Sequence, residues 1–214
     1  MAQRPVFVAE DRAPFFRREY TEFVFYSGFS VMQKQRSIRS LHDSYSSKHS
    51  EDRILEISSK SEVTLGNLLS AFNLSITTKN GLHMTVETAF QGSKVFENGG
   101  PYTDLYGGTS IAAKKDVRLR ESGRVIGFSI FGNDFPTTPE TFFYDWLYVN
   151  ALNLHQEYHE EIMRYSAFTD IEFNPQRSIN CQAEAAALFV GLKRSGQLQE
   201  ALESKESFEN IVFR

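Results

Sequence analysis

The stretch LSAFNLSITTKNGLHMTVETAFQGSK, residues 69–94, contains signals for a hairpin and for a helix. Asn80 and Gly81 separate two short runs, and an Asn-Gly pair tolerates the positive φ angles of a tight hairpin turn. The hydroxyl of Thr85 can accept hydrogen bonds from the amides of a first helical turn, so a helix is predicted over 86–96. Together the signals predict a hairpin that leads directly into a helix.

Three polar residues of this predicted helix share one face. Glu87, Gln91 and Lys94 are spaced by four and three positions, which aligns them at about 100° per residue. A first-turn carboxylate is favoured by roughly 0.3–1 kcal/mol, and it can stabilise an oxocarbenium ion or orient water. A desolvated lysine can hold a phosphate or attack a ring-opened sugar. The spacing alone fits an exposed Glu–Lys face equally well, so both interpretations stay open.

Composition excludes several classes of protein. The chain has 214 residues, 41% of them hydrophobic, which suffices for one domain with a core. A net charge of −4 argues against a dedicated nucleic-acid binder but permits a local basic patch. The single cysteine, Cys181, favours a reducing compartment, and the five histidines show no metal-ligand spacing. No signal-like or membrane-spanning apolar run is present, so a cytoplasmic protein without a membrane or metal partner is predicted.

The order of elements favours the α+β class, because strands and helices mix without a regular βαβ rhythm. A helix-rich domain with a small sheet is expected over 51–214, and residues 1–50 are expected to form a strand–helix extension packed on its core. The further expected elements are a strand at 22–26, a helix over 31–45, a strand over 53–61, a helical turn in 64–74, one long helix after Pro139, a strand at 168–173 and a final helix over 179–196 that Gly196 ends.

An acidic segment lies near the C-terminal end of the predicted domain. Alternation in FTDIEFN, residues 168–174, places Asp170, Glu172 and Asn174 on one face of the expected strand. That face is either exposed to solvent, as in many antiparallel sheets, or turned toward the same pocket as Glu87.

Other segments offer ligand-binding chemistry. NPQRSIN leads into the final helix, where free amides can bind a diphosphate, although N-capping by Ser178 or Asn180 explains it equally well. The glycine-rich loop ENGGPYTDLYGG carries Tyr102, which can stack on a base or a sugar, but the loop matches no known phosphate fingerprint. The run KKDVRLR includes Lys115 and Arg118, which are either solvated or available to phosphates.

The opening stretch resembles the NADAR (YbiA-like) family, whose core runs from (F/L)SNF through a short hairpin to (T/S)xEhxFQxxK. The chain has LSAF at 69–72, NG at 80–81 and TVETAFQGSK at 85–94, in the same order and spacing. Weaker similarity to ISSKS and FTDIEFNPQRSINCQA extends the resemblance over about 54–195. The whole chain is more similar still to members of this family that act as antitoxins to DarT-type toxins, which ADP-ribosylate DNA.

This resemblance implies a hydrolase that removes ADP-ribose from guanine bases in DNA and so reverses a DarT-type toxin. It implies ADP-ribose as product, no cofactor and no metal, and a single-stranded or flipped guanine as substrate. The expected catalytic residues are Glu87, Lys94 and Asp170. The expected ADP-ribose contacts are Ser59, Lys60, Ser61, Phe72, Gln91, Tyr102, Arg118, Ser178 and Asn180. The expected DNA contacts are Lys34, Arg36 and Lys115.

Two other functions stay open at this stage. One is an N-glycosidase that acts on a small ribosylated metabolite, and the other is a non-catalytic module that binds ADP-ribose or inhibits the toxin directly. Reversing the basic charges at 34–39 and 114–120 would impair only an enzyme with a DNA substrate. Loss of Glu87 would leave a non-catalytic protein effective.

Overall fold

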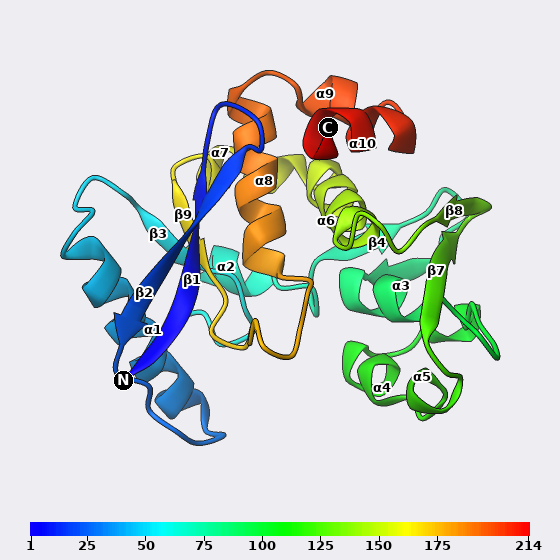
Figure 1. The fold of residues 1–214 in the computed structure, drawn as a ribbon, viewed down its shortest axis with the longest axis horizontal. Helices are drawn as coiled ribbons and strands as arrows, with labels where there is room; N and C mark the ends of the chain where they lie inside the picture. The colour runs from blue at the N-terminus through cyan, green and yellow to red at the C-terminus, as the bar shows by residue number, and fades with distance from the viewer. The chain divides into compact units, whose positions relative to one another are not determined.

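The computed structural model describes residues 1–214, which form two compact units. Unit 1 joins residues 1–70 to 155–214, and unit 2 comprises residues 71–154. Helices and three small sheets of four, two and three strands confirm the α+β class (Figure 1). The boundary expected at residue 50 stays a prediction. None of the helices combines the length and apolar character needed to cross a membrane.

Unit 1 is built on the four-stranded sheet β2-β1-β9-β3. Its strands are β1 (Ala2–Ala9), β2 (Phe16–Phe23), β3 (Ile54–Glu56) and β9 (Ala167–Thr169). β1 pairs antiparallel with both β2 and β9, and β3 runs parallel to β9. The first 50 residues therefore supply two neighbouring strands of this sheet rather than one strand.

The strand expected at 22–26 is wrong in its bounds, because β2 ends at Phe23. The backbone amide of Val24 donates to the Ser40 hydroxyl at 3.0 Å, and that of Tyr26 donates to the Ser37 hydroxyl at 2.9 Å. Serine side chains of the following helix thus accept hydrogen bonds from backbone amides that would pair with a neighbouring strand if β2 were longer. β1 has no counterpart among the expected strands, because its buried run at 5–9 does not alternate.

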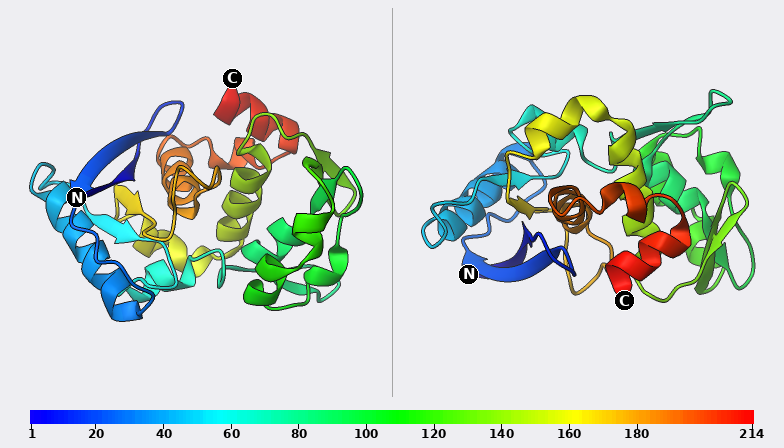
Figure 2. Two further views of the ribbon diagram at one scale, coloured as in Figure 1. Left: turned by 60° about the horizontal axis from the view of Figure 1, so that its bottom comes forward. Right: turned by 90° about the horizontal axis from the view of Figure 1, so that it is seen from above.

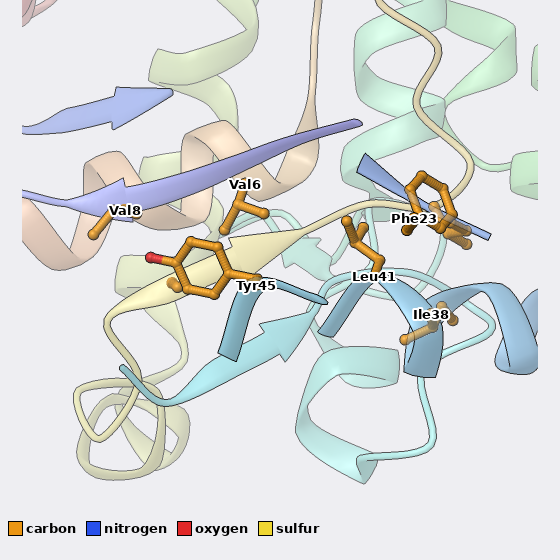
Figure 3. Close-up of a cluster of buried hydrophobic side chains, with 8 residues drawn as sticks. Val6, Val8, Phe23, Ile38, Leu41 and Tyr45 are labelled. Atoms are coloured by element: carbon orange, nitrogen blue, oxygen red, sulfur yellow. The ribbon is translucent and has the colours of Figure 1, made fainter. Parts of the chain in front are cut away.

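The helices of unit 1 cover this sheet. The helix expected over 31–45 is confirmed as α1 (Val31–Ser46), and its apolar stripe of Ile38, Leu41 and Tyr45 packs on Val6, Val8 and Phe23 (Figure 3). The final helix is confirmed as α8 (Gln182–Arg194), which lies beside β1 and is buried along most of its length (Figures 1 and 2). The remaining helices are α2 (Thr64–Leu68), α7 (Gln156–Ile162), α9 (Leu198–Ala201) and α10 (Lys205–Phe213).

Unit 2 contains the hairpin and helix of the opening stretch. The elements in chain order are β4 (Ser75–Thr77), β5 (His83–Thr85), α3 (Val86–Gly92), β6 (Lys94–Phe96), η1 (Thr103–Leu105), α4 (Ser110–Lys115), α5 (Arg118–Glu121), β7 (Val125–Ile130), β8 (Asn133–Phe135) and α6 (Phe142–Leu154). β4 and β5 pair antiparallel, and the second sheet has the order β6-β7-β8. The predicted turn is confirmed, but only Gly81 has a positive φ, at 79°. Phe90, Phe128 and Phe143 stack in the core.

Four expected elements are longer than the observed ones. The strand expected over 53–61 is only β3, Ile54–Glu56. The helix after Thr85 ends at Gly92, because a chain reversal at Ser93 pairs Lys94 with Phe128 of β7. The expected long helix after Pro139 is broken at His155, whose ψ of 70° is not helical, into α6 and α7. The expected strand at 168–173 is only β9, Ala167–Thr169.

We expect Gly191→Ala to lower the free energy of unfolding by about 1–3 kcal/mol, because it overpacks a tight contact. A Cβ at Gly191 in α8 would lie 2.1 Å from the carbonyl oxygen of Phe15. Gly107→Ala is the control, since its Cβ would meet no atom within 4 Å. Thermal unfolding of both variants measures the difference, and equal melting temperatures would contradict this account of α8 packing.

Candidate active site

Unit 2 links a carboxylate, an amide and an amine in one hydrogen-bonded chain. The Nε2 of Gln91 donates to Oε1 of Glu87 at 2.9 Å, and Nζ of Lys94 donates to Oε1 of Gln91 at 2.8 Å. The orientation of the amide follows from chemistry, because a carboxylate only accepts and an ammonium only donates. Glu87 and Gln91 lie on α3, whereas Lys94 is the first residue of β6. The three side chains therefore meet as expected, although across a helix–strand junction.

This chain is largely removed from solvent. Glu87 is 6% exposed and Gln91 is 7% exposed. Burial lowers the pKa of Lys94, the negative charge of Glu87 opposes that shift, and the positive charge of Lys114 adds to it. A lowered pKa increases the fraction of neutral amine, which is the nucleophilic form of a lysine.

Two cations flank Glu87, and each lies over an aromatic ring. Nζ of Lys114 on α4 is 4.0 Å from Oε1 of Glu87 and 5.0 Å from the ring centre of Phe72. Nζ of Lys94 lies 4.7 Å from the ring centre of Phe90. A ring face attracts a cation without cancelling its charge, so both ammonium groups can still act on an anionic ligand.

Hydrogen bonds fix the start of α3 next to the start of α4. Thr85 and Thr88 form a capping box at the first turn of α3, and the Thr85 hydroxyl lies 2.8 Å from the hydroxyl of Ser110 on α4. The backbone amide of Glu87 donates to the carbonyl of Ala71 at 2.9 Å. Glu87 is thus held by local capping and by two neighbouring segments, which fixes its position relative to α4.

Unit 1 contains a second buried polar cluster, around β9. The Thr169 hydroxyl donates to Oε2 of Glu56 at 2.6 Å, and the amide of Ile171 donates to Oε1 at 2.8 Å. Nε2 of His42 lies 2.8 Å from the Thr169 hydroxyl. Burial raises the pKa of Glu56 to about 8, and the neighbouring charge of Asp170 adds to the shift. Burial also raises the pKa of Asp170 to about 7.

The prediction that Asp170, Glu172 and Asn174 share one face of a strand is wrong. β9 ends at Thr169, and Asp170 is buried while Glu172 is exposed. The reason is local, because Oδ1 of Asp170 accepts the amide of Glu172 at 2.9 Å and so closes a turn.

A family model described as DarT1-associated NADAR antitoxin matches residues 2–214. The chain belongs to this family. Among curated proteins, none matches the chain. The resemblance carried by LSAF and TVETAFQGSK is confirmed, and these NADAR motifs supply Phe72, Glu87, Gln91 and Lys94 to the cluster in unit 2.

Other predicted residues of unit 2 lie in a separate network. Arg118 binds Asp104 at 2.7 Å and Asp116 at 2.9 Å, and its guanidinium lies 4.5 Å from the ring centre of Tyr102. The hydrogen bonds that its guanidinium donates to Asp116 and Asp104 raise the pKa of Arg118. Two carboxylates already balance this cation, so an incoming diphosphate would have to displace one. Lys115 is exposed at the end of α4.

The predicted ADP-ribose contacts of unit 1 occupy two loops. Ser59, Lys60 and Ser61 follow β3, and Nζ of Lys60 donates to the Ser59 hydroxyl at 2.9 Å. Neither Ser178 nor Asn180 caps α8, whose N-cap is Cys181 without a side-chain hydrogen bond. The capping explanation for NPQRSIN is therefore wrong.

The predicted DNA contacts Lys34 and Arg36 lie on α1. Nζ of Lys34 is 3.3 Å from Glu172, whereas the guanidinium of Arg36 lies 4.1 Å from the ring centre of Tyr26. A further group, His49, Glu51 and Asp52, has potential metal-ligand atoms within 4.8 Å of one another.

Sequence reasoning missed two residues of the polar clusters. Lys114 belongs to the basic run KKDVRLR in the sequence, and α4 places it beside Glu87. Glu56 is the single acid in the apolar run ILEI, and this isolated acid is the signal that could have identified it.

We expect the stability of the protein to fall as pH rises from about 6.5 to about 9. The pKa values of Glu56 and Asp170 are raised on folding, so their contribution is full below the unfolded values and is lost as pH passes the folded ones. Burial lowers the pKa of His42 from its ordinary 6.5 to about 4. The protonation of His42 therefore changes the stability only at pH values below this window. Glu56→Gln should flatten the decline by roughly 1–3 kcal/mol.

Melting temperatures across this pH range provide the measurement, with Glu51→Gln, an exposed acid of the same unit, as control. An equal slope for wild type and Glu56→Gln would show that Glu56 does not take up a proton on folding.

Proposed function

We propose that this DarT1-associated NADAR antitoxin is a glycosidase that removes ADP-ribose from guanine bases in DNA, acting in the cytoplasm without a metal or cofactor. The observation that carries the proposal is the buried chain of Glu87, Gln91 and Lys94. It brings together two groups that can promote cleavage of a ribosyl C–N bond: a fixed carboxylate and an amine whose pKa is lowered.

Glu87 acts on the charge that develops during bond cleavage. As the bond between the anomeric carbon and the guanine nitrogen breaks, positive charge builds up on the ribose. A carboxylate that is already oriented stabilises this charge without reorganisation, or takes a proton from the attacking water. Gln91 keeps one oxygen of Glu87 hydrogen-bonded and so fixes the direction of the other.

Lys94 has two possible roles. In the first, its ammonium protonates or positions the departing guanine. In the second, its neutral amine attacks the anomeric carbon, and guanine leaves with the bonding pair and takes up a proton. The ribosyl amine then opens to an imine, which water hydrolyses to ADP-ribose and free Lys94. The lowered pKa of Lys94 supports the second role, because it increases the neutral fraction.

The rest of ADP-ribose and the DNA strand need further contacts. Phe72, whose ring holds Lys114, offers a face for adenine or ribose. We assign Tyr102 and Arg118 to the ribose and diphosphate, and Lys115 to the strand. In unit 1 we assign the loop residues after β3, together with Ser178 and Asn180, as further diphosphate contacts. Asp170 is the third catalytic candidate, supported by its raised pKa.

We expect Glu87→Gln to slow hydrolysis by about 10²–10⁴-fold, because it removes the charge and keeps the size of the side chain. The substrate is a short single-stranded oligonucleotide with one ADP-ribosylated guanine, and its mass is followed over time. Glu97→Gln is the matched control, since Glu97 is an exposed acid of unit 2 that pairs with Arg124. An unchanged rate for Glu87→Gln would remove Glu87 from the mechanism.

Failure of the wild-type protein to restore the oligonucleotide mass would overturn the proposed activity. Hydrolysis of a small ribosylated metabolite in the same assay would then favour the metabolite glycosidase. Protection of toxin-expressing cells by Glu87→Gln would favour a non-catalytic antitoxin.

We expect borohydride to trap ADP-ribose covalently on Lys94, because it reduces an imine to a stable secondary amine. Trapping should increase with pH as Lys94 loses its proton, and Lys94→Met should abolish it. Lys114→Met is the control, since Lys114 is a second lysine near Glu87 but is 58% exposed. Intact-protein and peptide mass spectra locate the adduct. Its absence on a wild-type protein that is active would assign Lys94 the acid or positioning role.

A further inference from the structure

A basic and aromatic surface lies at the start of α1, outside the clusters described above. Residues 24–42 contain no acid, although the whole chain has 27 acids and a net charge of −4. We call the following five residues the aromatic–basic platform: Phe25, Tyr26, Phe29, Lys34 and Arg36. They belong to the loop between β2 and α1 and to the first turns of α1 (Figure 1).

The aromatic rings of the platform are held out toward solvent by an ordered loop. Phe29 is 102% exposed, as in a chain without neighbours, and Phe25 is 36% exposed. Three serines attach the loop to α1: Ser37 and Ser40 accept the amides of Tyr26 and Val24, and Ser30 caps the helix through the amide of Gln33. An exposed ring on a fixed backbone makes no packing contact that stabilises the fold, but it is preorganised to stack on a ligand.

The cations of the platform lie on or near these rings. The Arg36 guanidinium is 4.1 Å from the ring centre of Tyr26 and has no acidic partner in the structure. Nζ of Lys34 is 5.8 Å from the ring centre of Phe25 and 3.3 Å from Glu172. A guanidinium that lies on a ring still points its N–H groups outward, where they can bind phosphate.

We propose that this platform binds single-stranded DNA, with a base stacked on Phe29 and phosphates bound to Arg36 and Lys34. Rings that alternate with cations match a strand that alternates unpaired bases with phosphates. A duplex would hide the base faces, and an acidic protein would use the cations but not a fully exposed ring. Val31 and Met32, both exposed, extend the apolar surface beside Phe29.

Binding to unmodified DNA tests the platform independently of hydrolysis. We expect Phe29→Ala and Arg36→Ala each to raise the Kd of the full-length protein for a single strand of about ten nucleotides roughly tenfold. Arg36→Ala should also reduce the slope of log Kd against log salt by about one. Phe131→Ala and Arg124→Ala are matched controls, since both residues are exposed in unit 2.

A second, kinetic test connects the platform to hydrolysis, and this test rests on the proposed function. For an ADP-ribosylated strand of the same length, Phe29→Ala should raise KM and leave kcat unchanged, and it should leave hydrolysis of an ADP-ribosylated mononucleotide unaffected. If no substrate is hydrolysed, the proposed function fails while the binding test stands. Wild-type affinity for DNA in both platform variants would overturn the inference, and loss of toxin binding in those same variants would assign the surface to a protein.

Discussion

The amide of Gln91 is the contact on which the proposed chemistry depends. A direct ion pair between Glu87 and Lys94 would stabilise the ammonium form and raise the pKa of the amine. The amide instead accepts from one charged group and donates to the other, at 2.8 Å and 2.9 Å. Both groups stay hydrogen-bonded, as burial requires. Burial remains the larger influence on Lys94, so its pKa is lowered despite the nearby carboxylate.

The sequence predicts which residues form this hydrogen-bonded series better than it predicts how they are arranged. Helical spacing correctly links Glu87 to Gln91, and Thr85 caps α3 as its position predicts. Lys94 reaches Gln91 by another route, because α3 stops at Gly92 and the chain turns into β6. The stop is a tertiary effect, since Lys94 pairs with Phe128 of β7, which lies far along the chain. No pattern within residues 85–96 reports that neighbour.

Side chains that capture backbone amides explain the main errors in unit 1. Ser37 and Ser40 end β2 early, and Asp170 turns the chain after β9. Such competition between side chain and backbone is local in space, but the serines lie more than ten positions from the amides they bind. The amphipathic pattern of α1 is predicted correctly, because one apolar face of this helix packs on one sheet and the periodicity of the sequence marks that face. Lys114 and Glu56 were missed because their partners are distant in sequence.

Several cations of this acidic chain lie on aromatic rings. Lys94 and Lys114 lie over Phe90 and Phe72, and Arg36 lies over Tyr26. The attraction of a ring is worth about 0.5–2 kcal/mol and holds the cation in place.

A carboxylate partner would hold such a cation as well, but it would also cancel the charge that attracts a phosphate. Arg118 also lies over a ring, that of Tyr102, but Asp104 and Asp116 bind it and balance its charge, whereas Arg36 has no acidic partner. A protein with net charge −4 repels a polyanion at long range, so its affinity for DNA depends on cations that remain uncancelled at short range. The rings beside those cations hold them in place without neutralising them, and they also offer a surface on which a base can stack.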